Sequence, residues 1–223
     1  MNIGVTYAEL GGMGRFGNQL FQIASTIGLA LKEKAPYGFN SWDYESYFVN
    51  PLPKIDNNIY YTALKGYLQS YKNFEHCYDV IRKQFELKPL DLVVPENTVF
   101  IHFRAYSNDL LGNVTHIHPE QLAEYYQEAI KRFPNKNFIV FTDNINAAKK
   151  VLSFLNCEIV SSEKWINDFY VMSKCDGGIL ANSSFSWWAG WLTGGKVVAP
   201  QKWFTEKATY ETNGYYLKQW EKL

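Results

Sequence analysis

The stretch GGILANSSFSWWAGWLT (residues 177–193) joins an apolar run to a helical pattern through a serine-rich turn. Residues 177–181 have the length and composition of a buried strand, and the tryptophans of 186–193 recur at the three- and four-residue steps of one helix face. A strand that leads into a helix in this way is typical of a βαβ unit. A helix beside such a strand is usually buried, so these tryptophans are predicted to be core residues rather than a platform for a sugar ring.

Similar patterns extend from this stretch toward both ends of the C-terminal half. Strands are predicted at 99–103, 138–141, 159–160 and 196–199, and helices between them at 122–133, 145–155 and 166–174. This alternation predicts an α/β fold with a parallel sheet and right-handed crossovers. Since ligands of such sheets bind at the carboxyl ends of the strands, the residues that follow each run are the candidate site residues.

The N-terminal part has a less regular pattern. Strands are predicted at 1–7 and 59–68, helices at 20–31 and 74–85, and a glycine-rich turn at 11–17. We interpret the aromatic segment 42–53 as a long surface loop, whose Trp42, Tyr44 and Tyr47 either stack on a sugar or pack on their own lobe. The proline-containing segment 87–97 is the predicted linker, and it divides the chain into domains at 1–94 and 95–223.

Composition narrows the possible partners. The 223 residues contain 22 Lys and Arg and 22 Asp and Glu, so the net charge is zero and no nucleic-acid partner is predicted. The three cysteines have neither a zinc nor a disulfide spacing and are predicted to be buried thiols. The sequence shows no leader pattern and no membrane span, so we expect a cytoplasmic protein. Peripheral membrane contact and the oligomeric state stay open.

Polar or glycine-rich groups follow four of the predicted strands, at 11–19, 102–104, 141–143 and 181–186. Arg104 would place a permanently charged guanidinium where an anion can bind, or would form an ordinary surface ion pair. Ser183 and Ser184 would lie at a helix N-terminus, either as part of an anion cradle or as a plain N-cap.

Several kinds of chemistry are disfavoured. The glycine-rich turn lacks both the dinucleotide fingerprint and the phosphate-binding P-loop, and the order of Ser, His and Asp fits no covalent hydrolase. No Asp-x-Asp occurs and the histidines form no ligand pattern, so no metal site is predicted. Any phosphate charge would then be neutralised by protein donors.

Five stretches, taken in order, resemble the α-1,2-fucosyltransferase family, glycosyltransferase family 11. They are 14–24, 66–74, 102–104, 168–173 leading into 181–188, and 199–204. The resemblance implies a compact GT-B type α/β enzyme, with two Rossmann-like lobes and parallel sheets. It further implies transfer of L-fucose from GDP-fucose to a galactose-type hydroxyl of a glycan acceptor in α-1,2 linkage, with inversion and without a metal or other cofactor.

The resemblance also assigns roles to single residues. Arg104 matches the catalytic arginine that grips the donor pyrophosphate, His102 lies beside the nucleotide, and Asp168 falls where relatives place a carboxylate on the guanine edge. The other donor-binding residues that it implies are Asp143, the helix start Asn182, Ser183, Ser184 and Phe185, and Gly17, Asn18 and Gln19 on the glycine loop of the opposite lobe.

One motif departs from the family pattern. His-x-Arg-Arg-x-Asp reads His102-Phe-Arg104-Ala105-Tyr-Ser107 here, so the second arginine and the aspartate are both replaced. Two alternatives follow: a transferase that uses another GDP-sugar, and a non-catalytic relative that binds a glycan or nucleotide. Arg15 and Asp109 are candidates to supply the missing charges. Candidates for the base that activates the acceptor are Glu9, Asp43 and Asp109.

Overall fold

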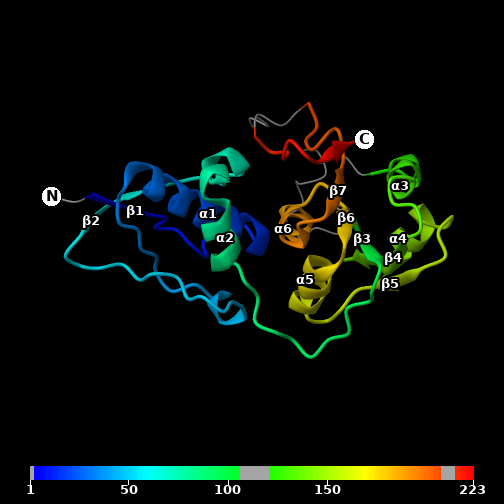
Figure 1. Cartoon of the computed structure of the whole chain (residues 1–223), viewed down its shortest axis with the longest axis horizontal. Helices are drawn as coiled ribbons and strands as arrows, with labels where there is room; N and C mark the ends of the chain where they lie inside the picture. The colour runs from blue at the N-terminus through cyan, green and yellow to red at the C-terminus, as the bar shows by residue number, and fades with distance from the viewer. Residues whose placement is uncertain (1–2, 106–120, 207–213) are drawn as a thin grey trace. The chain divides into compact units, whose positions relative to one another are not determined.

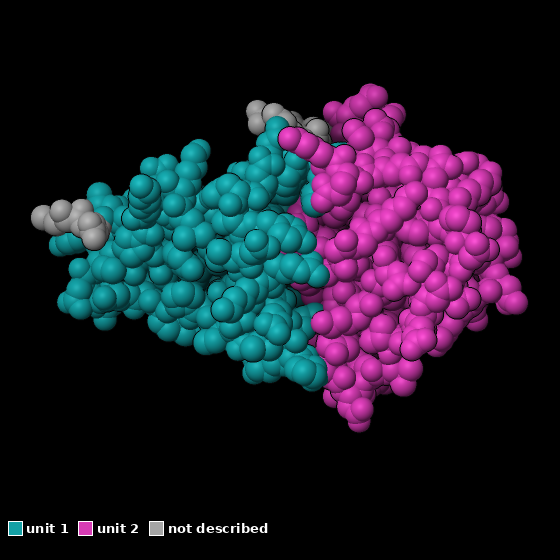
Figure 2. Space-filling model, in the orientation of Figure 1, with its two compact units in different colours: residues 1–89, 212–217 teal, residues 90–211, 218–223 magenta. Residues whose placement is uncertain are grey.

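The computed structural model describes residues 3–105, 121–206 and 214–223. The chain forms two compact units, which Figure 2 colours separately: Met1–Pro89 with Thr212–Leu217, and Leu90–Glu211 with Lys218–Leu223. We call them the N-terminal unit and the C-terminal unit. The chain passes from the first to the second inside the segment predicted to be the linker. The return of residues 214–217 to the N-terminal unit is a feature that the sequence patterns do not predict.

The described residues of the C-terminal unit form a six-stranded parallel sheet in the spatial order β5-β4-β3-β6-β7-β8. Numbered from β3, this is the 3-2-1-4-5-6 order of the doubly wound dinucleotide-binding sheet. The order reverses between β3 and β6. The strands are β3 (Thr98–Phe103), β4 (Asn137–Thr142), β5 (Glu158–Val160), β6 (Gly177–Ile179), β7 (Lys196–Ala199) and β8 (Glu221–Lys222).

Helices cover both faces of this sheet (Figure 1). Helices α3 (Ala123–Ile130) and α4 (Ile145–Val151) lie on one face, and α5 (Trp165–Lys174) and α6 (Ser184–Thr193) lie on the other. A parallel sheet that is covered on both faces needs strands that are apolar throughout, and all six residues of β3 are buried. The predicted α/β class with a parallel sheet is confirmed.

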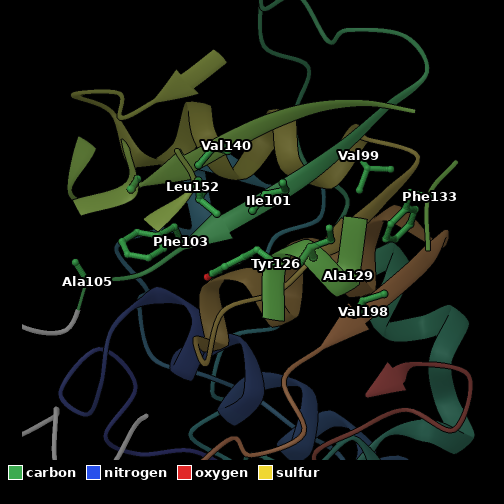
Figure 3. Close-up of a cluster of buried hydrophobic side chains, with 12 residues drawn as sticks. Val99, Ile101, Phe103, Ala105, Tyr126, Ala129, Phe133, Val140, Leu152 and Val198 are labelled. Carbon is green, nitrogen blue, oxygen red and sulfur yellow. The ribbon is translucent and has the colours of Figure 1, made fainter. Parts of the chain in front are cut away.

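Successive side chains of β3 point to opposite faces of the sheet. Val99, Ile101 and Phe103 pack against Tyr126 and Ala129 of α3 in one apolar cluster, as Figure 3 shows. On the neighbouring strand β6, a Cβ at Gly178 would lie 2.3 Å from the Phe100 ring, so only glycine leaves room for that aromatic side chain.

The tryptophans of α6 are core residues, as predicted. Trp187, Trp188 and Trp191 are all buried. The ring centroids of Trp187 and Trp188 are 5.0 Å apart, and Trp187 also contacts Trp220, at 5.1 Å, just before β8. The cluster therefore joins α6 to the last strand of the sheet instead of facing a ligand.

The N-terminal unit contains a smaller parallel sheet. Its strands β1 (Ile3–Thr6) and β2 (Tyr60–Ala63) pair over four residues, and helix α1 (Phe16–Glu33) follows β1. The predicted helix at 74–85 is divided, because short 3-10 turns precede a seven-residue α-helix. The turns are η2 (Tyr71–Asn73) and η3 (Glu75–Cys77), and the helix is α2 (Tyr78–Gln84). A further 3-10 turn, η1 (Glu45–Tyr47), lies in the aromatic segment.

The interpretation of residues 42–53 as a surface loop is wrong for the side chains of Trp42 and Phe48, which are buried. Trp42 is only 5% exposed and stacks on Phe16 and Phe48, with centroid distances of 6.2 Å and 5.4 Å. Its indole N–H donates a hydrogen bond of 2.7 Å to Gln19 Oε1. Trp42 therefore packs on its own lobe, which is one of the two predicted alternatives.

Two further expectations can be compared with the described residues. Cys77, Cys157 and Cys175 are free thiols, the first and last of them buried. Among the described helices, none combines the length and the apolar character that a membrane crossing needs.

Candidate functional site

The candidate site lies where the strand order of the C-terminal unit reverses. Strands β3 and β6 are neighbours there, and the next helices along the chain, α3 after β3 and α6 after β6, lie on opposite faces of the sheet. Ligands of doubly wound sheets bind at this switch point, beyond the carboxyl ends of the strands. Arg104 directly follows β3, Asp143 directly follows β4, and the serine-rich turn follows β6.

Arg104 is held by an acidic neighbour. Its guanidinium forms an ion pair with Asp143, and only 15% of the Arg104 side chain is exposed. The other Asp143 oxygen accepts the backbone N–H of Ala105 at 3.0 Å. Arg104 thus forms an ion pair, as one alternative holds, in which the Arg104 side chain is largely buried and Asp143 is partly exposed.

His102 is buried in β3 beside Arg104. It is 6% exposed, and no described residue lies within hydrogen-bond distance of its Nδ1. Burial, with a smaller contribution from the Arg104 guanidinium, lowers the pKa of His102 from 6.5 to about 3. The ring is therefore neutral near pH 7. Buried polar atoms usually have partners, so this nitrogen is a candidate ligand contact.

The serine-rich turn starts α6 and caps it. Ser183 is the N-cap residue, and its hydroxyl oxygen accepts the N–H of Phe185 at 3.3 Å. The plain N-cap alternative is therefore realised, and it is compatible with anion binding because the backbone N–H groups of a first helical turn attract anions. Ser183, Ser184 and Phe185 are half-buried.

Asn182 supports this turn from within the protein. It is 1% exposed, and its amide nitrogen donates to the carbonyl oxygens of Lys202 at 2.7 Å and Trp203 at 2.6 Å. Its carbonyl oxygen accepts from the Gln121 side chain. These contacts tie the turn between β6 and α6 to the segment after β7, which makes Asn182 a positioning residue for the start of α6.

Asp168 lies in the first turn of α5 and is largely buried. One oxygen accepts the backbone N–H of Ser162 at 3.2 Å, and the other accepts the Ser162 hydroxyl. Burial raises the pKa of Asp168, while these two hydrogen bonds act in the opposite direction. Ser162 follows β5 and was missed by the sequence analysis, although its place after a strand end is the signal that identified the other candidates.

Aromatic rings connect the helix that carries Asp168 to the helix start at Ser183. Phe185 contacts Phe169 of α5 at 5.2 Å and His102 of β3 at 5.8 Å between centroids. The Phe185 ring of α6 therefore contacts both β3, which carries His102, and α5, which carries Asp168. These contacts bring three elements with candidate donor-binding residues together.

Hydrogen bonds of Asn18 and Gln19 hold the glycine loop of the N-terminal unit in its conformation. Gln19 is buried, and its amide donates to the Gly14 carbonyl at 2.9 Å while accepting from Trp42. Asn18 accepts from Gln69, and a Cβ at Gly14 would collide with the Asn18 side chain. In this structure Asn18 and Gln19 shape the loop, and the buried Gly17 lies in the first turn of α1.

The remaining candidates are placed as follows. Glu9 and Asp43 are exposed in the N-terminal unit, whereas Ser107 and Asp109 lie outside the described residues. Across the described ranges, no three His, Cys, Asp or Glu side chains gather as metal ligands would.

Comparison with protein families gives a match to the model described as glycosyl transferase family 11, over residues 29–223. The chain belongs to glycosyltransferase family 11. The predicted family is thereby confirmed. The family 11 match begins after the glycine loop, so it covers Arg104, Asp143, Asp168 and the start of α6 but not Asn18 and Gln19.

Two curated proteins of Escherichia coli are similar to this family 11 chain. One, an alpha-1,2-colitosyltransferase, is 30% identical over 153 residues, which are 62% of this chain and 52% of that protein. The other, the O-antigen biosynthesis glycosyltransferase WbnK, is 31% identical over 119 residues, 48% of this chain and 39% of that protein. The chain thus spans about half the length of the curated relatives it matches, or less.

Solved structures of the fucosyltransferase NodZ are also similar. The structure from Bradyrhizobium is 14% identical with a TM-score of 0.47, covering 84% of this chain and 91% of that one. A NodZ α-1,6-fucosyltransferase crystal soaked with GDP-fucose is 13% identical with a TM-score of 0.46, covering 86% and 91%.

Proposed function

We propose that this chain transfers L-fucose, or a closely related sugar, from a GDP-sugar to a hydroxyl of a glycan acceptor. The observation that carries the proposal is that Arg104 and the start of α6 follow neighbouring strands at the switch point of a doubly wound sheet, in a chain of family 11. A guanidinium and a helix N-terminus both favour a diphosphate.

Residues of α5 and of the start of α6 would recognise the nucleotide. A carboxylate accepts hydrogen bonds from the two N–H groups on the guanine edge, and Asp168 supplies a carboxylate whose orientation Ser162 fixes. Each carboxylate oxygen has two acceptor sites, so the bonds from Ser162 are compatible with this role. The Nδ1 atom of His102 would contact the donor as a neutral group.

The proposed reaction is direct displacement at C1 of the donor sugar, with inversion and an α-1,2 linkage in the product. The acceptor hydroxyl forms the new bond to C1 and gives its proton to a base, for which Glu9, Asp43 and Asp109 are the candidates, as the bond between C1 and the GDP oxygen breaks. Negative charge then grows on the departing GDP. Arg104 and the backbone N–H groups of α6 would stabilise that charge without a metal ion, and a preorganised donor of this kind contributes about 10²- to 10³-fold in rate.

A second donor sugar is favoured by one comparison. The relative that is 30% identical is named an alpha-1,2-colitosyltransferase, so colitose is a candidate beside fucose. The replacement of the motif's second arginine and aspartate at Ala105 and Ser107 is consistent with a changed sugar pocket.

Calorimetric titration with GDP, GDP-fucose, GDP-colitose, GDP-mannose and UDP, each with and without EDTA, tests the proposal. We expect GDP to bind with micromolar affinity, UDP to bind more weakly, and EDTA to have no effect. Either GDP-fucose or GDP-colitose should bind more tightly than GDP-mannose. Equal binding of all three GDP-sugars would contradict the sugar assignment. Failure of every nucleotide to bind would support a non-catalytic relative instead.

A further inference from the structure

The contacts of Asp143 point to a role other than touching the donor. An ionised carboxylate has no hydrogen to donate and repels phosphate, so it is poorly suited to hold a pyrophosphate. Its two oxygens instead contact the Arg104 guanidinium and the Ala105 backbone N–H. We propose that Asp143 is a positioning residue that fixes the side chain and the backbone of Arg104. This inference rests on the proposed function, since it assumes that Arg104 binds the diphosphate.

Strand register brings the two charges together. Phe103 of β3 is the register partner of Thr142 of β4, so Arg104 and Asp143 each follow the last residue of a paired strand. Neighbouring strands lie only about 4.8 Å apart. A slip of one residue would turn the side chain of Asp143 to the other face of the sheet. The pairing of β3 with β4 therefore determines which carboxylate Arg104 meets.

The backbone on both sides of Arg104 is also anchored. Phe103 and Ala105 are buried in the same apolar cluster (Figure 3), and the Ala105 N–H is bound by Asp143. An arginine side chain has many rotamers, and the ion pair restricts them before a ligand arrives. A guanidinium has five N–H donors, more than a single carboxylate oxygen accepts, so the ion pair is compatible with a diphosphate ligand.

Asp143 also gives Arg104 an acidic partner although the motif's own aspartate is replaced. The family pattern carries its aspartate in the segment after the arginine, where this chain has Ser107. Here the carboxylate comes from the end of the adjacent strand β4. This explains how an arginine without the motif's own aspartate is still held by an acid.

The test compares Asp143→Asn, Arg104→Ala and the double variant with wild type. Asp143→Asn keeps the shape of the side chain and an oxygen for the Ala105 N–H but removes the charge that holds Arg104. Asp176→Asn is the matched control, because Asp176 pairs with Lys136 at 2.7 Å just before β6, at the amino end of the sheet. Calorimetry measures the binding of GDP, inorganic pyrophosphate and guanosine, and circular dichroism and Tm report folding.

We expect Asp143→Asn to weaken GDP and pyrophosphate binding by about 10- to 100-fold, because misplacing a positioned group has effects of that size. Guanosine, which lacks the diphosphate, should bind as to wild type, and Asp176→Asn should change nothing. In the Arg104→Ala background, Asp143→Asn should add no more than about a twofold loss, since the two residues act as one unit. Asp143→Glu, which keeps the charge, should recover part of the affinity.

Other results would overturn the inference. These are unchanged GDP binding by Asp143→Asn, losses that multiply in the double variant, an equal loss of guanosine binding, or no recovery in Asp143→Glu. A wild type that binds pyrophosphate through Arg104 but does not bind GDP would contradict the proposed function alone, because the role of Asp143 is still measured with pyrophosphate. A wild type that binds none of the three probes would contradict both.

Discussion

Replacing His102 by phenylalanine should remove a loss of stability that wild type shows in mild acid. The pKa of His102 is about 3 in the folded chain, against 6.5 for an ordinary histidine, because the ring is buried and lies near Arg104. The unfolded chain therefore takes up a proton first as the pH falls below 6.5. Above pH 6.5 the titration of His102 does not lower the free energy of unfolding. Between pH 6.5 and pH 3 it lowers that free energy progressively.

The size of the effect follows from the two pKa values. At pH 5, which is 1.5 units below the ordinary value of 6.5, protonation of the unfolded state lowers the free energy of unfolding by about 2 kcal/mol relative to pH 8. His102→Phe keeps a planar ring but cannot titrate, so the difference in unfolding free energy between pH 8 and pH 5 should be smaller by that amount.

Urea unfolding at constant ionic strength, followed by tryptophan fluorescence at pH 5, 6, 7 and 8, measures this difference. Six of the seven tryptophans belong to the C-terminal unit, so the signal reports the unit that contains His102. His76→Gln, a change at an exposed histidine of the N-terminal unit, is the control. If wild type and His102→Phe depended on pH in the same way, the argument that a buried neutral ring lies at the switch point would be refuted.

Three further predictions concern the proposed donor site. Arg104→Ala should lower the transfer rate by at least about 10²-fold while the circular dichroism spectrum is unchanged, and near-normal turnover would remove Arg104 from the mechanism. Ser183→Ala should destabilise the chain by about 1 kcal/mol in urea unfolding, whereas Ser183→Asp should keep the cap but weaken GDP binding in calorimetry, because it places a negative charge beside the phosphates. Equal GDP binding by these two variants would argue against an anion at this helix start. Asp168→Asn should reduce the preference for GDP over UDP by about tenfold or more in competition titrations, and an unchanged preference would assign guanine recognition to another residue.

The C-terminal unit was predictable because its signals are local and repeated. The apolar runs at 99–103, 138–141 and 196–199 correspond to β3, β4 and β7 within one residue at every end. Strand β8 was missed because its two residues, Glu221 and Lys222, are charged and have no periodicity. Its place in the sheet comes from hydrogen bonds with β7, which is a tertiary contact that no local pattern contains.

The aromatic segment of the N-terminal unit shows a second limit. Trp42 and Phe48 have no regular spacing, and an aperiodic segment with prolines is typical of a surface loop. They are buried because Phe16 of α1 offers a ring to stack on and Gln19 offers an oxygen to the indole N–H. Both partners come from a different part of the chain, so tertiary packing decided what local pattern could not.

The candidate site was predictable by residue type and position but not by partner. Arg104, Asp143 and Ser183 were found because each follows a strand. That Asp143 holds Arg104 depends on the register of β3 and β4, and that Ser162 holds Asp168 depends on how the segment after β5 folds back on α5. Register and loop conformation arise from the packed structure, so the sequence alone left open whether Arg104 binds an anion or forms an ordinary surface ion pair, and it named no partner for that pair.

These partners give the switch point a particular electrostatic character. Arg104 is balanced by Asp143, and His102 stays uncharged because it is buried beside that same guanidinium. In the proposed donor site, a bound diphosphate would therefore meet an oriented guanidinium and the backbone dipoles of α6. In such a site the direction of each donor matters more than the total charge, since preorganised dipoles need no reorganisation as charge develops on a leaving group. If the proposed function holds, Arg104 binds the diphosphate without the motif's second arginine, and its position depends on Asp143.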